Sequence, residues 1–94
     1  MTTLKEKGAS GPIEVWLTKG NIEVTCMIVF EDETSTDQSV DSLSMRGAQR
    51  EMTSFLINWG YEAAGRWDAE EVTDDGDVLE SVRRFRPAKQ KASA

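Results

Sequence analysis

The sequence predicts an α+β fold in which a four-stranded antiparallel sheet carries one amphipathic helix packed on one face, in the chain order β-β-α-β-β. Three observations predict this fold. Apolar residues recur with a helical period over residues 44–61, they alternate with polar residues before that segment, and two further apolar runs around a turn signal follow it. The expected organisation is a disordered N-terminal arm at 1–11, a single α+β domain at 12–86 and a basic flexible tail at 87–94.

The helix prediction rests on one apolar stripe. Its members follow the spacing of a helix face and are Met45, Ala48, Met52, Phe55, Leu56 and Trp59. The opposite side is polar, so the helix is expected to lie on the surface with its stripe against the sheet. Ser42 or Ser44 is the candidate cap, and Gly60 is expected to end the helix.

The first strand pair lies in residues 13–18 and 24–30, where apolar residues alternate with others. Gly20 and Asn21 suit a two-residue hairpin loop because both tolerate positive φ. That loop predicts a register with the pairs Leu17–Val24, Val15–Cys26 and Ile13–Ile28. All six side chains then lie on one face, under the helix.

The other face of this hairpin is less polar than a solvated sheet face. It carries Trp16, Thr25, Met27 and Val29. One interpretation is a small surface cluster, because single exposed apolar residues are common on proteins. We favour a second interpretation, in which a contiguous apolar row on a small chain is covered by a symmetric partner. These four residues are therefore the predicted protein interface.

The remaining segments predict a loop and a second hairpin. Residues 31–41 are acidic and rich in hydroxyl groups, which is typical of a solvated loop. Strands are predicted in residues 61–72 and 78–85, joined by a turn centred on Asp75-Gly76. That turn predicts two cross-strand contacts, Trp67 with Arg84 and Asp68 with Arg83.

Composition argues against most catalytic functions. The 94 residues include 17 Asp and Glu against 11 Lys and Arg, no His and one Cys. The lone Cys26 allows no intrachain disulfide, and the absence of His removes the usual proton shuttle and metal ligand. No nucleophile motif or phosphate-binding glycine loop is present. We therefore expect no enzyme activity, no cofactor and no metal site.

The acidic cluster before the last strand invites a calcium-site interpretation. It comprises Glu70, Glu71, Asp74, Asp75, Asp77 and Glu80. The cluster lacks the alternating ligand spacing of an EF-hand loop. We favour a hairpin turn whose carboxylates discourage pairing between sheet edges.

Basic residues gather at the C-terminal end, and the candidate nucleic-acid contacts are Arg83, Arg84, Arg86, Lys89 and Lys91. Cations interleaved with an aromatic ring suit phosphate contact and base stacking. The same pattern is typical of strand arginines paired with carboxylates, followed by a solubilising tail. The acidic chain favours this second interpretation, because phosphate binding opposes the surrounding negative field.

The sequence therefore predicts a small acidic, non-enzymatic protein-interaction module, a homodimeric regulator or inhibitor that binds another protein. The alternative is a nucleic-acid-binding regulator that uses the basic C-terminal strand and tail. A third function, ligand binding between sheet and helix, lacks convergent polar groups to support it. The first residues lack the apolar core of a signal peptide, and no apolar run suits a membrane span, so a cytoplasmic location without membrane contact is expected.

Overall fold

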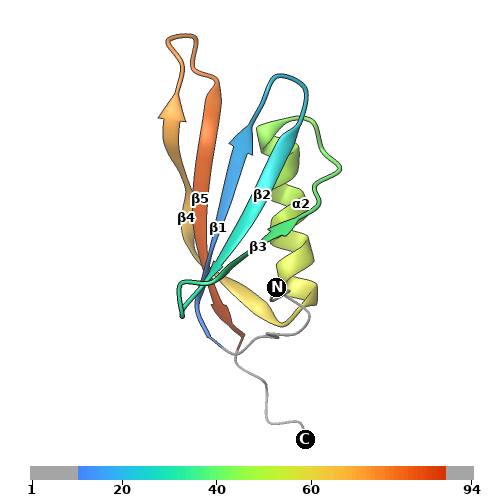
Figure 1. The fold of residues 1–94 in the computed structure, drawn as a ribbon, viewed down its shortest axis with the longest axis vertical. Helices are drawn as coiled ribbons and strands as arrows, with labels where there is room; N and C mark the ends of the chain where they lie inside the picture. The colour runs from blue at the N-terminus through green and yellow to red at the C-terminus, as the bar shows by residue number, and fades with distance from the viewer. Residues whose placement is uncertain (1–10, 89–94) are drawn as a thin grey trace, which may run out of the picture.

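Five antiparallel strands and one helix make up the described part of the chain, residues 11–88 of the computed structural model (Figure 1). In chain order the elements are β1 (Ile13–Lys19), β2 (Val24–Phe30), β3 (Ser35–Gln38), α2 (Met45–Asn58), β4 (Tyr61–Val72) and β5 (Val78–Pro87). The α+β class is confirmed. The predictions of four strands and of the order β-β-α-β-β are wrong. The predicted arm and tail fall almost wholly outside the described residues.

The missed strand is β3, which lies inside the segment predicted as a loop. Its four residues, STDQ, are all polar, and only Thr36 is buried. A tight turn brings β3 back along β2, because the Phe30 amide donates to the Thr34 carbonyl (2.8 Å) and Glu33 adopts a φ of 70°. A strand this short, with one inward side chain, shows no alternation of apolar residues that the sequence could reveal. Only its pairing with β2 identifies it as a strand.

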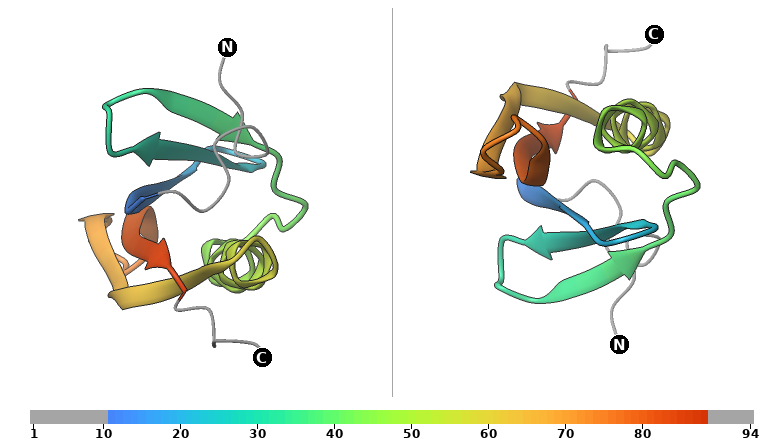
Figure 2. Two further views of the ribbon diagram at one scale, coloured as in Figure 1. Left: turned by 90° about the horizontal axis from the view of Figure 1, so that it is seen from below. Right: turned by 90° about the horizontal axis from the view of Figure 1, so that it is seen from above.

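The strands form one sheet in the order β3-β2-β1-β5-β4. Figure 2 shows that the sheet curves, with α2 on its concave side. We call the face toward α2 the inner face and the opposite one the outer face. The core lies between the inner face and α2, and its buried residues are Ile13, Val15, Leu17, Val24, Cys26, Ile28, Phe30, Met45, Ala48, Met52, Leu56, Tyr61 and Phe85.

Helix α2 begins after Ser44, whose Oγ accepts a hydrogen bond from the Gly47 amide at 3.0 Å. Of the two candidate caps, Ser44 is the residue directly before the first turn, so its side chain reaches a free amide three residues later. The last helical residue is Asn58, and Gly60 follows the Trp59 cap with a φ of 92°, as expected of the residue that ends the helix. Trp59 differs from the prediction: it packs on the Phe55 ring with centroids 5.9 Å apart and remains 37% exposed.

The first hairpin has the predicted faces but not the predicted register. Leu17 pairs with Cys26 and Val15 with Ile28, a shift of two residues. The cause is a longer loop, which the Gly20 amide closes by donating to the Glu23 carbonyl at 2.7 Å. A shift of two residues leaves every side chain on its original face, so the buried set is as predicted.

The second hairpin departs from its predicted register at a bulge. Ala64 pairs with Arg84 and Asp68 with Val82, so β4 holds two extra residues between these pairs. Gly65 lies in the bulge with a φ of 96°, a conformation that suits glycine. The predicted contacts of Trp67 with Arg84 and of Asp68 with Arg83 are therefore wrong.

Candidate functional site

The four predicted interface residues share the outer face of the sheet. Trp16 on β1 pairs with Met27 on β2, and on its other side with Val82 on β5. Thr25 and Val29 flank Met27 along β2. We call Met27, Trp16 and Val82 the central row. Val82 was missed by sequence reasoning because β5 joins β1 only through the tertiary fold.

The central row is partly shielded by its own neighbours. Met27 is 41% exposed, whereas Trp16 and Val82 are half-buried. The Trp16 indole N–H donates to Glu14 Oε1 at 3.3 Å, which satisfies its polar end on the same face. The row therefore offers a narrow apolar contact with a fixed tryptophan at its centre.

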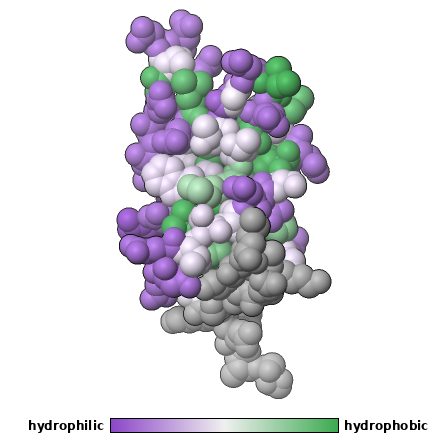
Figure 3. All heavy atoms as spheres, in the orientation of Figure 1, coloured by the Kyte–Doolittle hydropathy of each residue, from purple (hydrophilic) through white to green (hydrophobic). Residues whose placement is uncertain are grey.

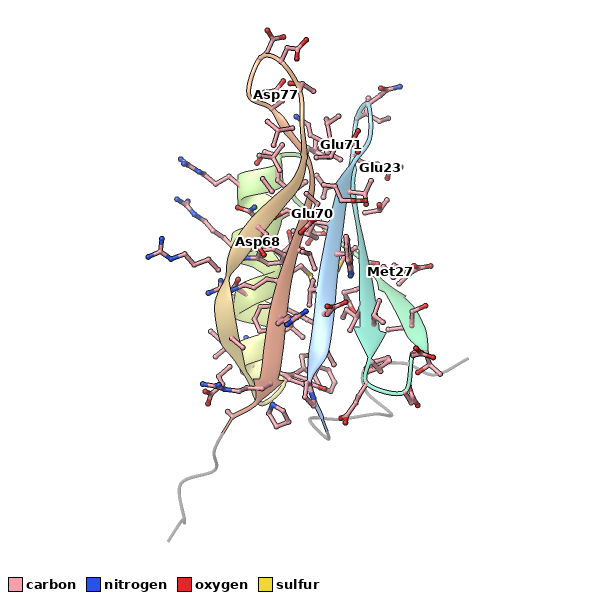
Figure 4. The ribbon with its side chains drawn as sticks, turned by 90° about the vertical axis from the view of Figure 1, so that its left-hand side faces the viewer. Glu23, Met27, Asp68, Glu70, Glu71 and Asp77 are labelled. Carbon is pink, nitrogen blue, oxygen red and sulfur yellow. The ribbon has the colours of Figure 1, made fainter. Side chains whose placement is uncertain are left out.

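Charged residues of both signs lie on the outer face, and the exposed Asp37 on β3 is paired with Met27. In Figure 4 the carboxylates of Glu23, Glu71 and Asp77 lie toward the end that holds the β1–β2 loop and the β4–β5 turn, and those of Asp68 and Glu70 lie closer to the middle of the sheet. Toward the other end, Arg84 pairs with Glu14 (3.3 Å) and Arg86 with Glu62 (2.9 Å). The Arg84 and Arg86 side chains stay 76% and 60% exposed. In the space-filling view, hydrophilic residues line much of the outline around paler and apolar residues (Figure 3).

A hollow of about 520 Å³ opens on the outer face beside the central row. It is lined by Glu14, Trp16, Ala64, Gly65, Arg66, Asp68, Glu70, Val82, Arg83 and Arg84. The bulge in β4 makes room for it, since the extra residues lift the edge strand from regular pairing. Positively and negatively charged side chains surround the Trp16 indole in this hollow.

The candidate nucleic-acid contacts do not form one surface in the described residues. Arg84 and Arg86 lie on the outer face, while Arg83 pairs with Val15 and lies on the inner side. Strand alternation causes this separation. Lys89 and Lys91 lie outside the described residues.

Arg83, which also borders the outer hollow, lines a second cleft between α2 and the β4–β5 pair. We call it the arginine cleft, and its lining is Arg46, Gln49, Arg50, Thr53, Ser54, Trp67 and Arg83. Its volume is about 680 Å³. Arg46 and Arg50 belong to the polar side of the helix, which the sequence predicts to lie opposite the apolar stripe. Their four-residue spacing was the available signal, but only the bulge in β4 brings Trp67 and Arg83 to the same place.

Cys26 is buried in the core. Burial, followed by the charges of Asp37 and Glu51, raises the pKa of its thiol to about 12. A thiol in that environment stays protonated near neutral pH and is a poor nucleophile. Residues 11–88 hold no group of three or more His, Cys, Asp or Glu side chains placed to bind a metal ion.

Within residues 11–88, no helix is both long and apolar enough to cross a membrane. Comparison of the chain with protein-family models, with curated proteins and with solved structures found no match. The candidate surfaces must therefore be judged on their own geometry.

Proposed function

We propose that this chain is a non-enzymatic protein-interaction module that forms a homodimer through the outer face of its sheet. The observation that carries the proposal is the central row, because its three residues lie side by side on a face that no other described element covers. A two-fold axis near Trp16 would place each row against its copy and bury Met27.

The charges of the outer face favour a second copy of this chain as its binding partner. Along β5 the outward side chains run Glu80, Val82, Arg84, from acidic through apolar to basic. In a two-fold dimer whose sheets pack face to face, the exposed Arg84 of one copy would lie near Glu80 of the other copy. Such self-complementarity favours pairing of like surfaces in opposite directions.

The proposed dimer leaves the β4–β5 turns free at its two ends. Each turn carries Asp74, Asp75 and Asp77, all exposed. These carboxylates would offer a regulator or inhibitor a contact with a basic surface on another protein. The nucleic-acid alternative has less support, because its arginines alternate between the two faces and two of them are in ion pairs.

Light scattering coupled to gel filtration tests the dimer. We expect the full chain to elute with twice its monomer mass at high micromolar concentration. Met27→Glu places a charge in the central row and is expected to give a monomer. Trp16→Glu is a second variant at the same contact, and the matched control is Ile57→Glu on α2, which is 56% exposed and distant from the outer face.

Circular dichroism should show the same spectrum for all folded variants. A wild-type chain that stays monomeric at every concentration contradicts the dimer. So does a dimer that both outer-face variants leave intact.

A further inference from the structure

We propose that the arginine cleft binds a small phosphorylated molecule of about nucleotide size. The first reason is its charge. Arg46, Arg50 and Arg83 line the cleft, and no carboxylate does. In a chain with 17 acidic and 11 basic residues, three cations gathered without an acid are an unusual arrangement.

The three arginines also lack partners of opposite charge among residues 11–88. The ion pairs there join Arg84 with Glu14 and Arg86 with Glu62, on the outer face. Arg46 and Arg50 are one helical turn apart, and like charges at that spacing destabilise a helix. A bound anion would reduce this repulsion and would give the three guanidinium groups the ion pair that they lack within residues 11–88.

The floor of the cleft holds Arg83 in a fixed orientation. Its Nε donates to the Gly65 carbonyl at 2.9 Å, and its Nη1 lies 3.4 Å from Thr53 Oγ1. The guanidinium lies over the rings of Phe85 and Trp67, at 5.6 Å and 6.0 Å from their centroids. A guanidinium held in this way meets a phosphate with little loss of conformational entropy.

The surrounding polar groups are held in the same network. Thr53 Oγ1 donates to the Gln49 carbonyl at 2.8 Å and accepts from the Trp67 indole N–H at 3.2 Å. Gln49 Nε2 donates to Ser81 Oγ at 3.1 Å. The floor is thus built from α2, β4 and β5, while Arg46 and Arg50 are exposed at the rim.

The size and surroundings of the cleft favour a small ligand over a polymer. The cleft is shallow and open to solvent, and its volume of about 680 Å³ gives room for a small group among the lining side chains. A nucleic acid strand would extend past the cleft and meet a chain with a net charge of −6. Repulsion along its length opposes that binding, whereas a compact phosphate group contacts the arginines alone.

Isothermal titration calorimetry of the full chain tests the proposal, with ATP, sodium triphosphate and adenosine as separate probes in magnesium-free buffer. We expect ATP to bind and adenosine not to bind. Binding of triphosphate as tight as ATP would assign the site to the phosphate chain alone, and weaker binding would add a contribution from the nucleoside. Both results support a phosphate site.

Arg50→Gln and Arg46→Gln are each expected to weaken ATP binding about tenfold or more, the usual effect of losing a charge-assisted hydrogen bond. The matched control is Arg66→Gln, an exposed arginine of β4 that lines the outer hollow instead. Its affinity should stay within about twofold of wild type. Met27→Glu should bind ATP normally, which separates this site from the proposed dimer.

Three results would overturn the proposal. One is no heat of binding with either ATP or triphosphate. Another is equal affinity in the Arg46, Arg50 and Arg66 variants. The third is a single-stranded oligonucleotide that binds more tightly than ATP and depends on Arg46 and Arg50, since it would assign the cleft to nucleic acid.

Discussion

At the scale of single residues, the Glu51 side chain fixes the loop that precedes α2 through hydrogen bonds. The Glu51 carboxylate accepts hydrogen bonds from the Asp41 amide at 2.9 Å and from the Ser42 amide at 2.9 Å. The Ser42 hydroxyl donates a third bond to it at 3.0 Å. The Asp41 amide is the main cause of the lowered pKa of Glu51, burial opposes it, and the two Ser42 groups lower it further. One helix carboxylate thus fastens the chain that connects β3 to α2.

The lowered pKa of Glu51 predicts a pH-dependent contribution to stability. A carboxyl whose pKa is lower in the folded chain stabilises it above the ordinary value of 4.5, and this contribution is lost as pH falls through the folded pKa. We expect Glu51→Gln to reduce the free energy of unfolding by about 1 kcal/mol at pH 7, the typical net value of such hydrogen bonds. Urea unfolding at pH 7 and pH 3 measures the difference, which should shrink at pH 3.

The control for this prediction is Glu70→Gln, which removes an exposed carboxylate of β4. Its free energy of unfolding should stay within about 0.5 kcal/mol of wild type. An equal loss of stability by Glu51→Gln at both pH values would contradict an electrostatic role.

At the scale of elements, α2 depends on its cap and its packing more than on its composition. Gly47 and the β-branched Thr53 and Ile57 lower its helix propensity. The buried stripe compensates for them: Met45, Ala48, Met52 and Leu56 pack on the inner face. The Ser44 hydroxyl satisfies one free amide of the first turn, and no acidic residue in that turn assists it.

Ser44→Ala is therefore expected to lower the free energy of unfolding by about 1 kcal/mol, the usual cost of losing a cap. Ser54→Ala, at an exposed position of the same helix, is the matched control and should change it by less than about 0.5 kcal/mol. Chemical unfolding followed by circular dichroism measures both values. Equal effects of the two variants would show that the Ser44 cap does not stabilise the helix.

For the whole molecule, β1 is the strand on which the two halves of the chain meet. It pairs with β2 on one side and with β5 on the other. The β4–β5 hairpin extends past this pairing, because β1 reaches β5 no farther than Glu80, whereas the Val72–Val78 pair lies beyond it. Stability is therefore expected to fall from the centre of the sheet toward that hairpin end.

Amide hydrogen exchange followed by NMR tests this gradient. We expect β1 amides to show the greatest protection, since they lie in the middle of the sheet and above the core. The amides of residues 72–78 should exchange fastest among the strand and turn residues of the second half, because few apolar contacts hold that end. Equal protection in β1 and in residues 72–78 would contradict the proposed order of stability.

The sequence by itself determined the helix, the two hairpins and the inward side chains of the first hairpin and of most of the helix stripe. Those features depend on local period, and an alternating pattern such as Val15, Leu17 and Cys26, Ile28 keeps its inner face even when the register shifts by two. The four predicted interface residues share one face for the same reason. Sequence patterns of this kind report which side of an element is apolar.

Only the tertiary structure decided the fifth strand, the loop length, the bulge at Gly65 and the joining of β1 to β5. β3 has no apolar pattern of its own, and it becomes a strand because β2 offers an unpaired edge. Trp67 and Arg83 meet Arg46 and Arg50 because the bulge and the packing of α2 bring together segments far apart in the chain. Local sequence carries no signal for such contacts, since their free energy comes from groups that meet only after folding.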